Sequence, residues 1–239
     1  MTDIELMALK LLKRNNAKLK GDVILAATAD EEKGGEAGAG WLVRNHPDRV
    51  CADYVLNEGG GMAMQMDGSN MFTINTAEKG ILWFKVRAGG TPGHGSVPGG
   101  ADNAILRMNK VVEKLGGHRS KIMLVPTVRH YISEIAKSKE LRDLSVLLQD
   151  HLKSDQTLDK LAKRDKYLAE EIRARLRMTV TPTMIHGGVK ENIIPSECEA
   201  VFDCRVLPGQ TTTKALSEIK DILKDAALDK LSFEIIQAN

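Results

Sequence analysis

The spacing of apolar positions along the chain predicts an α/β segment over residues 1–77. Residues 1–16 carry apolar side chains at helical spacing, which predicts an amphipathic helix. Short apolar runs at residues 23–27 and 53–57 are typical of strands that are covered on both faces in a parallel sheet. A second helix is expected between these strands, over residues 36–45.

A hairpin and a change of pattern follow this segment. Residues 62–66 and 70–76 alternate between apolar and polar side chains and flank Asp67-Gly68, a pair that favours a tight hairpin turn. Beyond the hairpin the order of elements changes, so we expect a second domain over residues 78–239.

The second domain is predicted to have a ferredoxin-like arrangement. Its expected elements are a strand at 81–88, a helix at 101–115, strands at 181–187 and 197–207, a helix at 212–226 and a strand at 231–236. This β-α-β-β-α-β order is that of the split βαβ fold, in which two layers form. In residues 197–207 every second side chain is apolar, so one sheet face should meet the helices and the other should meet water or a partner.

A helical insertion is expected between the first helix and the second strand of this domain, at about residues 117–180. Two charged amphipathic stretches, residues 131–152 and 157–177, predict a pair of helices that form a hairpin. The predicted fold class is therefore α/β, with a partial three-layer α/β domain followed by a two-layer domain that carries this insertion.

Composition excludes several classes of protein. The chain of 239 residues is 42% hydrophobic and 28% charged, which is ordinary for a globular protein. With 34 basic and 32 acidic residues, it offers no charge imbalance for binding nucleic acid or an acidic membrane. No apolar run approaches the roughly 20 residues that a membrane span needs. Three widely spaced cysteines, Cys51, Cys198 and Cys204, favour reduced thiols and a cytoplasmic protein.

Acidic residues stand where the two predicted strands of the first domain end. Asp30, Glu31 and Glu32 follow the strand at 23–27, and Glu58 follows the next one, in front of three glycines. Ligands bind outside the carboxyl ends of strands in open α/β sheets, so these carboxylates could hold a hard cation. Two ordinary explanations stay open: acids suit the start of a helix, and a glutamate before glycines can belong to a simple turn.

These residues carry a resemblance to a known family. The stretches TADEEKGGEAGAGWLV and YVLNEGGG resemble the zinc exopeptidases and deacylases that include aminoacylase, carboxypeptidase S, acetylornithine deacetylase and succinyl-diaminopimelate desuccinylase. The resemblance implies that Glu31 is the general base and that Glu32 and Glu58 are ligands of paired zinc ions, for which cobalt could substitute. In such a site the metals activate a water molecule and a free carboxylate takes its proton.

The second domain then resembles the dimerisation lid of the same family. In the loop GGTPGHGSVPGG, His94 matches a histidine that reaches the active site of the other subunit and binds the developing oxyanion. Asn192 matches a residue that contacts substrate. Arg205 matches an arginine that binds the substrate carboxylate, a task that suits a guanidinium. A loop histidine is usually only solvated, Asn192 is a common turn residue, and Arg205 could instead pair with Asp203 or Glu199 on its own strand.

The resemblance covers only the middle of a family member. The family's HxD histidine, its bridging aspartate and a late histidine have no counterpart here. We therefore expect a complete lid with a fragment of the catalytic domain, which alone is inactive and binds zinc weakly or not at all, because imidazole supplies much of the affinity of such sites.

The function implied by the resemblance is hydrolysis of amide bonds, by a peptidase or an N-acyl-amino-acid deacylase that dimerises through its lid. Expected substrates are small peptides or N-acyl amino acids with a free carboxylate. Three alternatives stay open: a non-catalytic dimerisation module, half of a split enzyme, and a ferredoxin-like regulatory domain that binds a ligand.

Overall fold

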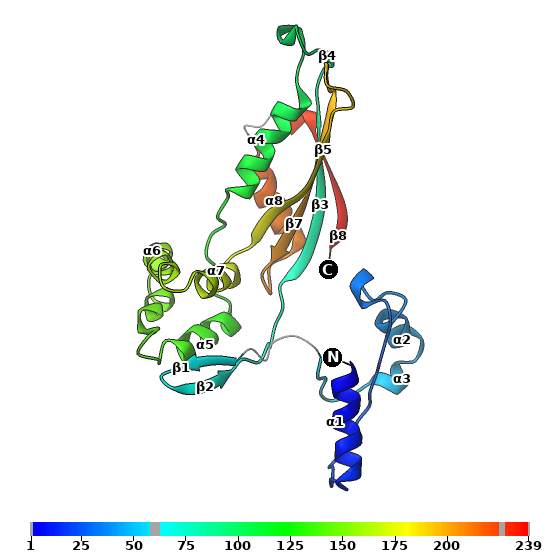
Figure 1. Ribbon diagram of the computed structural model, residues 1–239, viewed down its shortest axis with the longest axis vertical. Helices are drawn as coiled ribbons and strands as arrows, with labels where there is room; N and C mark the ends of the chain where they lie inside the picture. The colour runs from blue at the N-terminus through cyan, green and yellow to red at the C-terminus, as the bar shows by residue number, and fades with distance from the viewer. Residues whose placement is uncertain (1, 58–62, 225–227, 239) are drawn as a thin grey trace. The chain divides into compact units, whose positions relative to one another are not determined.

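The computed structural model describes the backbone of residues 2–57, 63–224 and 228–238 (Figure 1). The chain divides into two compact units, Met1–Gly60 and Gly61–Asn239. In the described part of the chain, no helix is long and apolar enough to cross a membrane.

The first unit is built from short helices. They are α1 (Thr2–Arg14), the 3₁₀ turn η1 (Glu31–Lys33), α2 (Ala39–Asn45) and α3 (Pro47–Val50). The helix expected over residues 1–16 is confirmed by α1, and α2 forms the last seven residues of the one expected over residues 36–45. None of the side chains described in residues 2–57 is buried.

The two strands expected in the first unit are wrong. Residues 23–27 and 53–57 form neither helix nor strand, and Val23 and Tyr54 are 54% and 92% exposed. A strand requires a neighbour that accepts and donates its backbone hydrogen bonds. Within the described residues of this unit no such neighbour is present, so the apolar runs stay unpaired.

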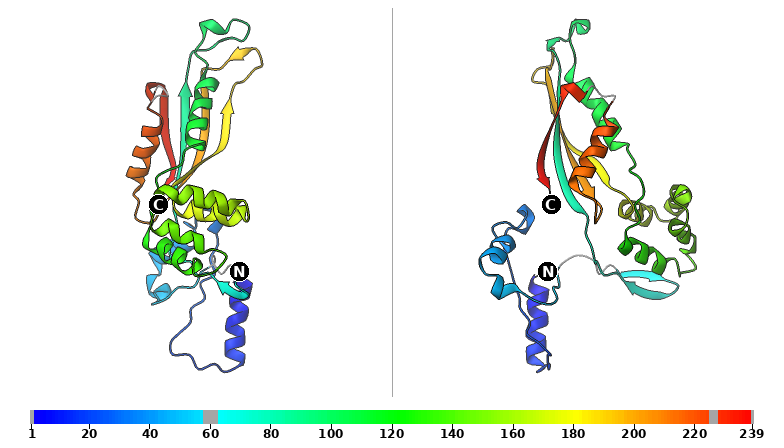
Figure 2. Two further views of the ribbon diagram at one scale, coloured as in Figure 1. Left: turned by 90° about the vertical axis from the view of Figure 1, so that its left-hand side faces the viewer. Right: turned by 180° about the vertical axis from the view of Figure 1, so that it is seen from behind.

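A four-stranded antiparallel sheet is the centre of the second unit. Its strands are β3 (Gly80–Gly89), β5 (Thr179–Gly187), β7 (Glu197–Val206) and β8 (Leu231–Ala238), in the order β5-β7-β3-β8. Helices α4 (Ala104–Gly116) and α8 (Thr212–Ile222) cover one face of the sheet, as the views in Figure 2 show. Outside the insertion, the strands and helices expected between residues 81 and 236 are all present, although α8 ends at Ile222.

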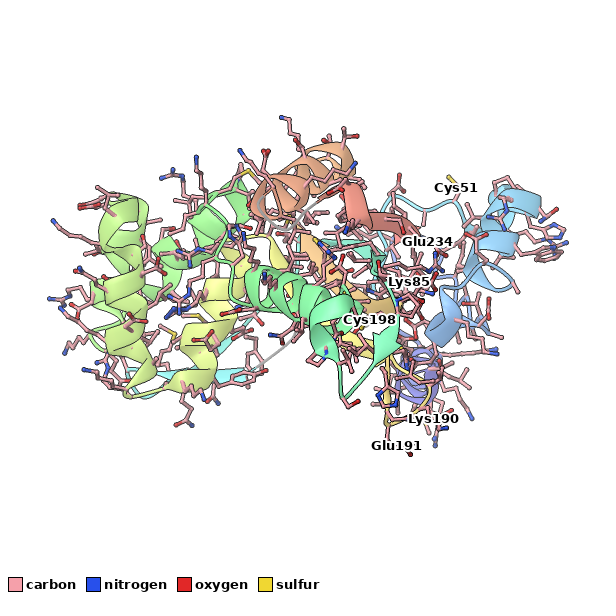
Figure 3. The ribbon with its side chains drawn as sticks, turned by 90° about the horizontal axis from the view of Figure 1, so that it is seen from above. Cys51, Lys85, Lys190, Glu191, Cys198 and Glu234 are labelled. Atoms are coloured by element: carbon pink, nitrogen blue, oxygen red, sulfur yellow. The ribbon has the colours of Figure 1, made fainter. Side chains whose placement is uncertain are left out.

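The alternation of β7 explains how this core forms. Its side chains at even positions are buried against α4 and α8, and Phe202 stacks on Phe84 of β3 with ring centroids 5.2 Å apart. The odd positions face the opposite side, where charged pairs cross the strands. There Glu199 lies 3.5 Å from Lys85, which is opposite Glu234 in the register of β3 and β8 (Figure 3). The predicted division into one buried and one polar face is confirmed.

The insertion occupies residues 117–178 and contains four helical segments. They are α5 (Pro126–Ile135), the 3₁₀ segment η3 (Arg142–Leu148), α6 (His151–Ala162) and α7 (Lys166–Arg175). The expectation of two long helices is wrong because the chain leaves the helical conformation after Ile135, Leu148 and Ala162, and new helices start after Asp150 and Asp165. The carboxylate of Asp150 caps α6 and that of Asp165 caps α7.

The predicted hairpin forms from β1 (Ala63–Met66) and β2 (Ser69–Phe72). Asp67 and Gly68 have φ angles of 49° and 78°, the left-handed conformation that a tight hairpin turn requires. The hairpin contributes Met66 to a second hydrophobic core, which is otherwise formed mainly by the insertion.

Candidate functional site

The acidic turn of the first unit is organised by Asp30. Its φ of 71° is left-handed, its carboxylate accepts a hydrogen bond from the amide of Ala37 at 2.9 Å, and its carbonyl accepts one from Gly35 at 2.7 Å. Gly38 is required because a Cβ there would lie 1.8 Å from the carbonyl oxygen of Ala29. The turn thus folds around Asp30, a supporting residue to which the sequence analysis assigned no role of its own.

Glu31 and Glu32 follow on η1, and both are exposed. Glu58, the third member of the predicted acidic site, lies outside the described residues. Among the residues that the structure does describe, no three His, Cys, Asp or Glu side chains are grouped so that they could hold a metal ion. The described residues therefore do not fit a zinc centre by themselves, and the assignments of Glu32 and Glu58 as ligands stay predictions.

The second set of predicted residues lies on an extension of the four-stranded sheet, which we call the arm (residues 89–103 and 188–196). Two short strands, β4 (Gly93–His94) and β6 (Ile193–Ile194), pair antiparallel in it. Figure 1 shows β4 beyond the end of the sheet.

The glycines of the arm allow its two segments to approach closely. A Cβ at Gly90 would lie 2.1 Å from the carbonyl oxygen of Asp102, and a Cβ at Gly93 would lie 2.7 Å from the Cβ of Ala101. Both distances are shorter than real contacts, so side chains are excluded at these positions. The glycines at positions 90 and 93 are therefore explained by the packing of the arm.

His94 is exposed on β4, and its hydrogen bonds define which ring nitrogen carries the proton. The backbone amide of Ser96 donates to Nδ1 at 3.2 Å, and the Ser96 hydroxyl lies 2.7 Å from the same atom. A backbone N–H can only donate, so Nδ1 must accept, and the neutral ring then carries its proton on Nε2. His94 therefore presents a donor, Nε2–H, on its outer side.

Asn192 lies next to His94 across the arm. The amide of Gly95 donates to the carbonyl of Asn192 at 2.8 Å, and His94 is opposite Ile193 in the strand register. Both predicted residues, His94 and Asn192, are exposed. The structure thus brings together two residues that are 98 positions apart in the sequence.

Arg205 is not part of this group. It lies near the far end of β7, eight residues beyond Glu197, so roughly 26 Å of strand separate it from the base of the arm. Its guanidinium pairs with the carboxylate of Asp203 at 2.7 and 3.2 Å and lies over the ring of Trp83. The alternative pairing considered in the sequence analysis is the one present here.

Asp102 supports the arm and was missed by the sequence analysis. Its carboxylate accepts hydrogen bonds from Lys230 at 2.6 Å and from Arg107 at 2.7 Å. The bond from Lys230 is the main reason why the pKa of Asp102 is lower than usual. Since Lys230 is 128 residues away in sequence, no local pattern could have revealed this contact.

Comparison with known proteins identifies the family to which the chain belongs. Residues 76–230 match the family model of the peptidase dimerisation domain, a range that covers the strands β3, β5 and β7, the arm and the insertion and ends just before β8. The chain belongs to the M20 peptidase family. The resemblance stated from the motifs is thereby confirmed.

Relatives within the M20 family align along almost the whole chain. The N-fatty-acyl-amino acid synthase/hydrolase of Mus musculus is 24% identical over 98% of this chain and 46% of its own length. Aminoacylase-1 of Sus scrofa is 24% identical over 97% of this chain and 46% of its length. An uncharacterized metallohydrolase of Methanococcus maripaludis is 34% identical over 91% of this chain and 41% of its length. The chain spans about half the length of the curated relatives it matches.

Proposed function

We propose that this chain is part of a metal-dependent hydrolase of amide bonds, which acts on small peptides or N-acyl amino acids with a free carboxylate. The observation that carries the proposal is the extent of the similarity. The dimerisation domain matches over residues 76–230, and relatives named as hydrolases and acylases align over 97–98% of the chain, including the acidic turn.

In this proposal residues 1–77 form part of a three-layer α/β catalytic domain. Glu31 is the general base, and Glu32 and Glu58 are the ligands that this segment supplies to a pair of zinc ions. When bound, the ions would supply a polarised water molecule. The exposed carboxylate of Glu31, on a turn that Asp30 anchors, is suited to accept a proton from such a water.

Residues 78–239 are the lid in this proposal, with a ferredoxin-like layout and a role in forming a homodimer. The strand order β5-β7-β3-β8 with two helices on one face supports that layout. We propose that His94 donates from Nε2 to the oxyanion in the partner's site, that Asn192 contacts substrate beside it, and that Arg205 binds the substrate carboxylate. Arg205 would exchange Asp203 for that carboxylate, since both offer the same bidentate geometry.

Hydrolysis assays with defined metals test the catalytic part. The purified chain is loaded with zinc or cobalt, and release of acetate from N-acetyl amino acids and of amino acids from dipeptides is measured together with metal content. We expect no turnover and no stoichiometric zinc pair for the chain alone. A tightly held pair of zinc ions in the purified chain would overturn this part of the proposal.

Substitution of Glu31 tests the assignment in an enzyme whose remaining ligands are supplied by an added complementary polypeptide. Glu31→Gln should abolish turnover while the metal content persists, because the amide keeps the size of the side chain but cannot take a proton. Loss of metal in this variant would instead make Glu31 a ligand.

A second candidate function is a dimerisation module without catalysis, either alone or as half of a split enzyme. Two observations favour it: no side chain described in residues 2–57 is buried, and no metal cluster is formed by the described residues. A sizing measurement that gives a dimer, together with no hydrolysis under any complementation, would support this candidate over the first.

A further inference from the structure

The hairpin β1–β2 packs into the insertion through three methionines. Met66 is only 7% exposed, and Met64 and Met71, which are partly buried, pack against the same hydrophobic cluster. The hydroxyl of Tyr131 on α5 lies 4.0 Å from the sulfur of Met64. Methionine fills irregular gaps well, which suits a contact between a hairpin and a set of short helices.

The tip of the hairpin is fixed by hydrogen bonds of Asp67. One carboxylate oxygen accepts from the hydroxyl of Ser138, and the other accepts from the amide of Lys139, both at 3.1 Å. Ser138 is 4% exposed, so its hydroxyl needs this partner. Apolar contacts thus hold the face of the hairpin, and hydrogen bonds hold its tip.

The insertion is fixed to the lid sheet on its other side. The ammonium of Lys79, just before β3, donates to the carbonyls of Ala174 and Arg177 at 3.0 and 2.8 Å. Leu207, just after β7, joins the core of the insertion. The insertion therefore contacts the hairpin on one side and the sheet on the other.

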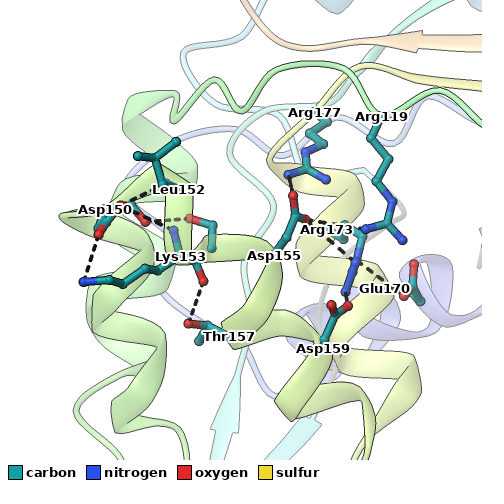
Figure 4. Close-up of polar contacts among 11 residues, drawn as sticks. Arg119, Asp150, Leu152, Lys153, Asp155, Thr157, Asp159, Glu170, Arg173 and Arg177 are labelled. Carbon is teal, nitrogen blue, oxygen red and sulfur yellow. Dashed lines mark hydrogen bonds and ion pairs between the residues drawn. The ribbon is translucent and has the colours of Figure 1, made fainter.

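A network of arginines stiffens the end of the insertion that meets the sheet (Figure 4). Arg177, which is 6% exposed, donates to Asp155 of α6 at 2.8 Å, and Arg173 of α7 pairs with Asp159 at 3.0 Å. These pairs join α6 to the segment that leads into β5. Separation of α6 from α7 and the residues just before β5 would leave buried guanidinium groups without these partners, which is costly.

The direct connection from the hairpin to the sheet is weak by comparison. Residues 73–79 form neither helix nor strand, and Ile74 is 85% exposed. They run along a cavity of about 110 Å³, whose opposite wall includes Tyr131 and Arg175 of the insertion. None of the predicted site residues that the structure describes lines this cavity.

We propose that the insertion is a clasp, which holds the hairpin in a fixed position on the lid. The segment that packs on the insertion is residues 63–72 of the same chain. That hairpin begins five residues after Glu58 in the sequence. The clasp itself does not depend on the proposed function.

Hydrogen exchange of the intact chain tests the clasp. Met66→Ala should speed the amide exchange of residues 63–72 at least about tenfold, while peptides from β3 and β7 keep their protection. The matched control is Phe72→Ala in the same hairpin, since Phe72 is 66% exposed and is outside the methionine contact. The control should leave the exchange of the hairpin unchanged.

Two results would overturn the proposal. One is a hairpin whose exchange is unaffected by Met66→Ala, and the other is an equal loss of protection in β3 and β7, which would mean that the hairpin and sheet form one inseparable unit. If Met66→Ala unfolds the insertion, Ser138→Ala replaces it. It removes the hydrogen bond to Asp67 at the tip and one local bond from the amide of Glu140, leaves the methionine contact in place, and should speed exchange of the turn about threefold. Since exchange is measured without substrate, the clasp can hold even if the hydrolase proposal fails.

Discussion

Two apolar stretches of this chain, residues 23–27 and β7, show how far an apolar pattern determines structure. In β7 the backbone pairs with β3 on one side and β5 on the other, and its even side chains are buried. In residues 23–27 no strand forms, and Ile24 is 51% exposed. An apolar run becomes a strand only where a neighbour satisfies its backbone and another layer covers its side chains.

The same contrast holds for aromatic residues. Phe84 and Phe202 stack in the core of the sheet and are fully buried, whereas Trp41 of α2 is 49% exposed. Burying an aromatic side chain contributes about 1.5–3 kcal/mol to stability. The second unit has this contribution in the core of its sheet, whereas no aromatic side chain is buried among the described residues of the first unit.

The largest expected effect is therefore the removal of a stacked ring. Phe202→Ala should lower the free energy of unfolding by about 3–5 kcal/mol, because it leaves a cavity under Phe84. Trp41→Ala should change it by at most about 1 kcal/mol. Urea denaturation followed by circular dichroism measures both. Equal losses in the two variants would show that the first unit has a core of its own.

The fold of the second unit could be predicted largely from periodicity. Alternation in residues 197–207 gave the buried face of β7, and Asp67-Gly68 gave the hairpin. The register between strands and the contacts of the insertion could not be predicted, because they depend on side chains far apart in the chain. The strands of the first unit were predicted wrongly because an apolar pattern does not show whether a neighbouring strand is present to pair with.

In the candidate site, only residues that belong to a recognisable sequence motif could be predicted. The motifs gave His94 and Asn192, which the structure places side by side, and Arg205, which lies far from them. They could not give the supporting roles of Asp30 and Asp102, since each acts by hydrogen bonds that only the folded chain shows. The roles of Glu31, Glu32 and Glu58 stay predictions.

The cysteines of the two units should differ in the rate at which they react with a thiol reagent. Cys51 of the first unit is exposed, whereas Cys204 is buried in the sheet core, and burial raises its pKa to about 12. Such a thiol is ionised about 10³ times less often at pH 8 than an ordinary cysteine, and the thiolate is the reactive form. A chromogenic disulfide reagent should titrate one thiol quickly and the other two, including buried Cys198, only after unfolding. Three equally fast thiols would contradict the described core.

The ion pairs of the insertion should contribute less than the aromatic core. Asp155→Asn should lower the free energy of unfolding by about 2 kcal/mol at pH 7, because Arg177 is buried and loses its anionic partner. Asp159→Asn is the matched control, since Asp159 is more exposed, and it should cost at most about 1 kcal/mol. Chemical denaturation of the two variants gives the difference.

The pH dependence of the same pair has a defined sign. The hydrogen bond from Arg177 holds the pKa of Asp155 below its usual range, so its stabilisation is present above about pH 4 and is lost as the pH falls through the lowered pKa. The stability curve of Asp155→Asn should therefore be flatter than that of the wild type on the acid side. An unchanged acid slope would show that the pair contributes nothing to folding.

The smallest effect is expected in the arm, which resembles the first unit in having little buried surface. Asp102→Asn removes the charge that Lys230 and Arg107 share, so the base of the arm should loosen while the sheet core stays intact. We expect the amides of residues 91–97 to exchange about threefold faster with no change in Tm, and Lys190→Ala in the exposed loop serves as the control. If exchange stays slow, the β4–β6 pair alone orders the arm, and the position of His94 depends on backbone pairing instead of on charge. If Tm falls as well, the arm and the sheet fold as one unit. The contrast between exposed and buried regions then separates only the first unit from the second.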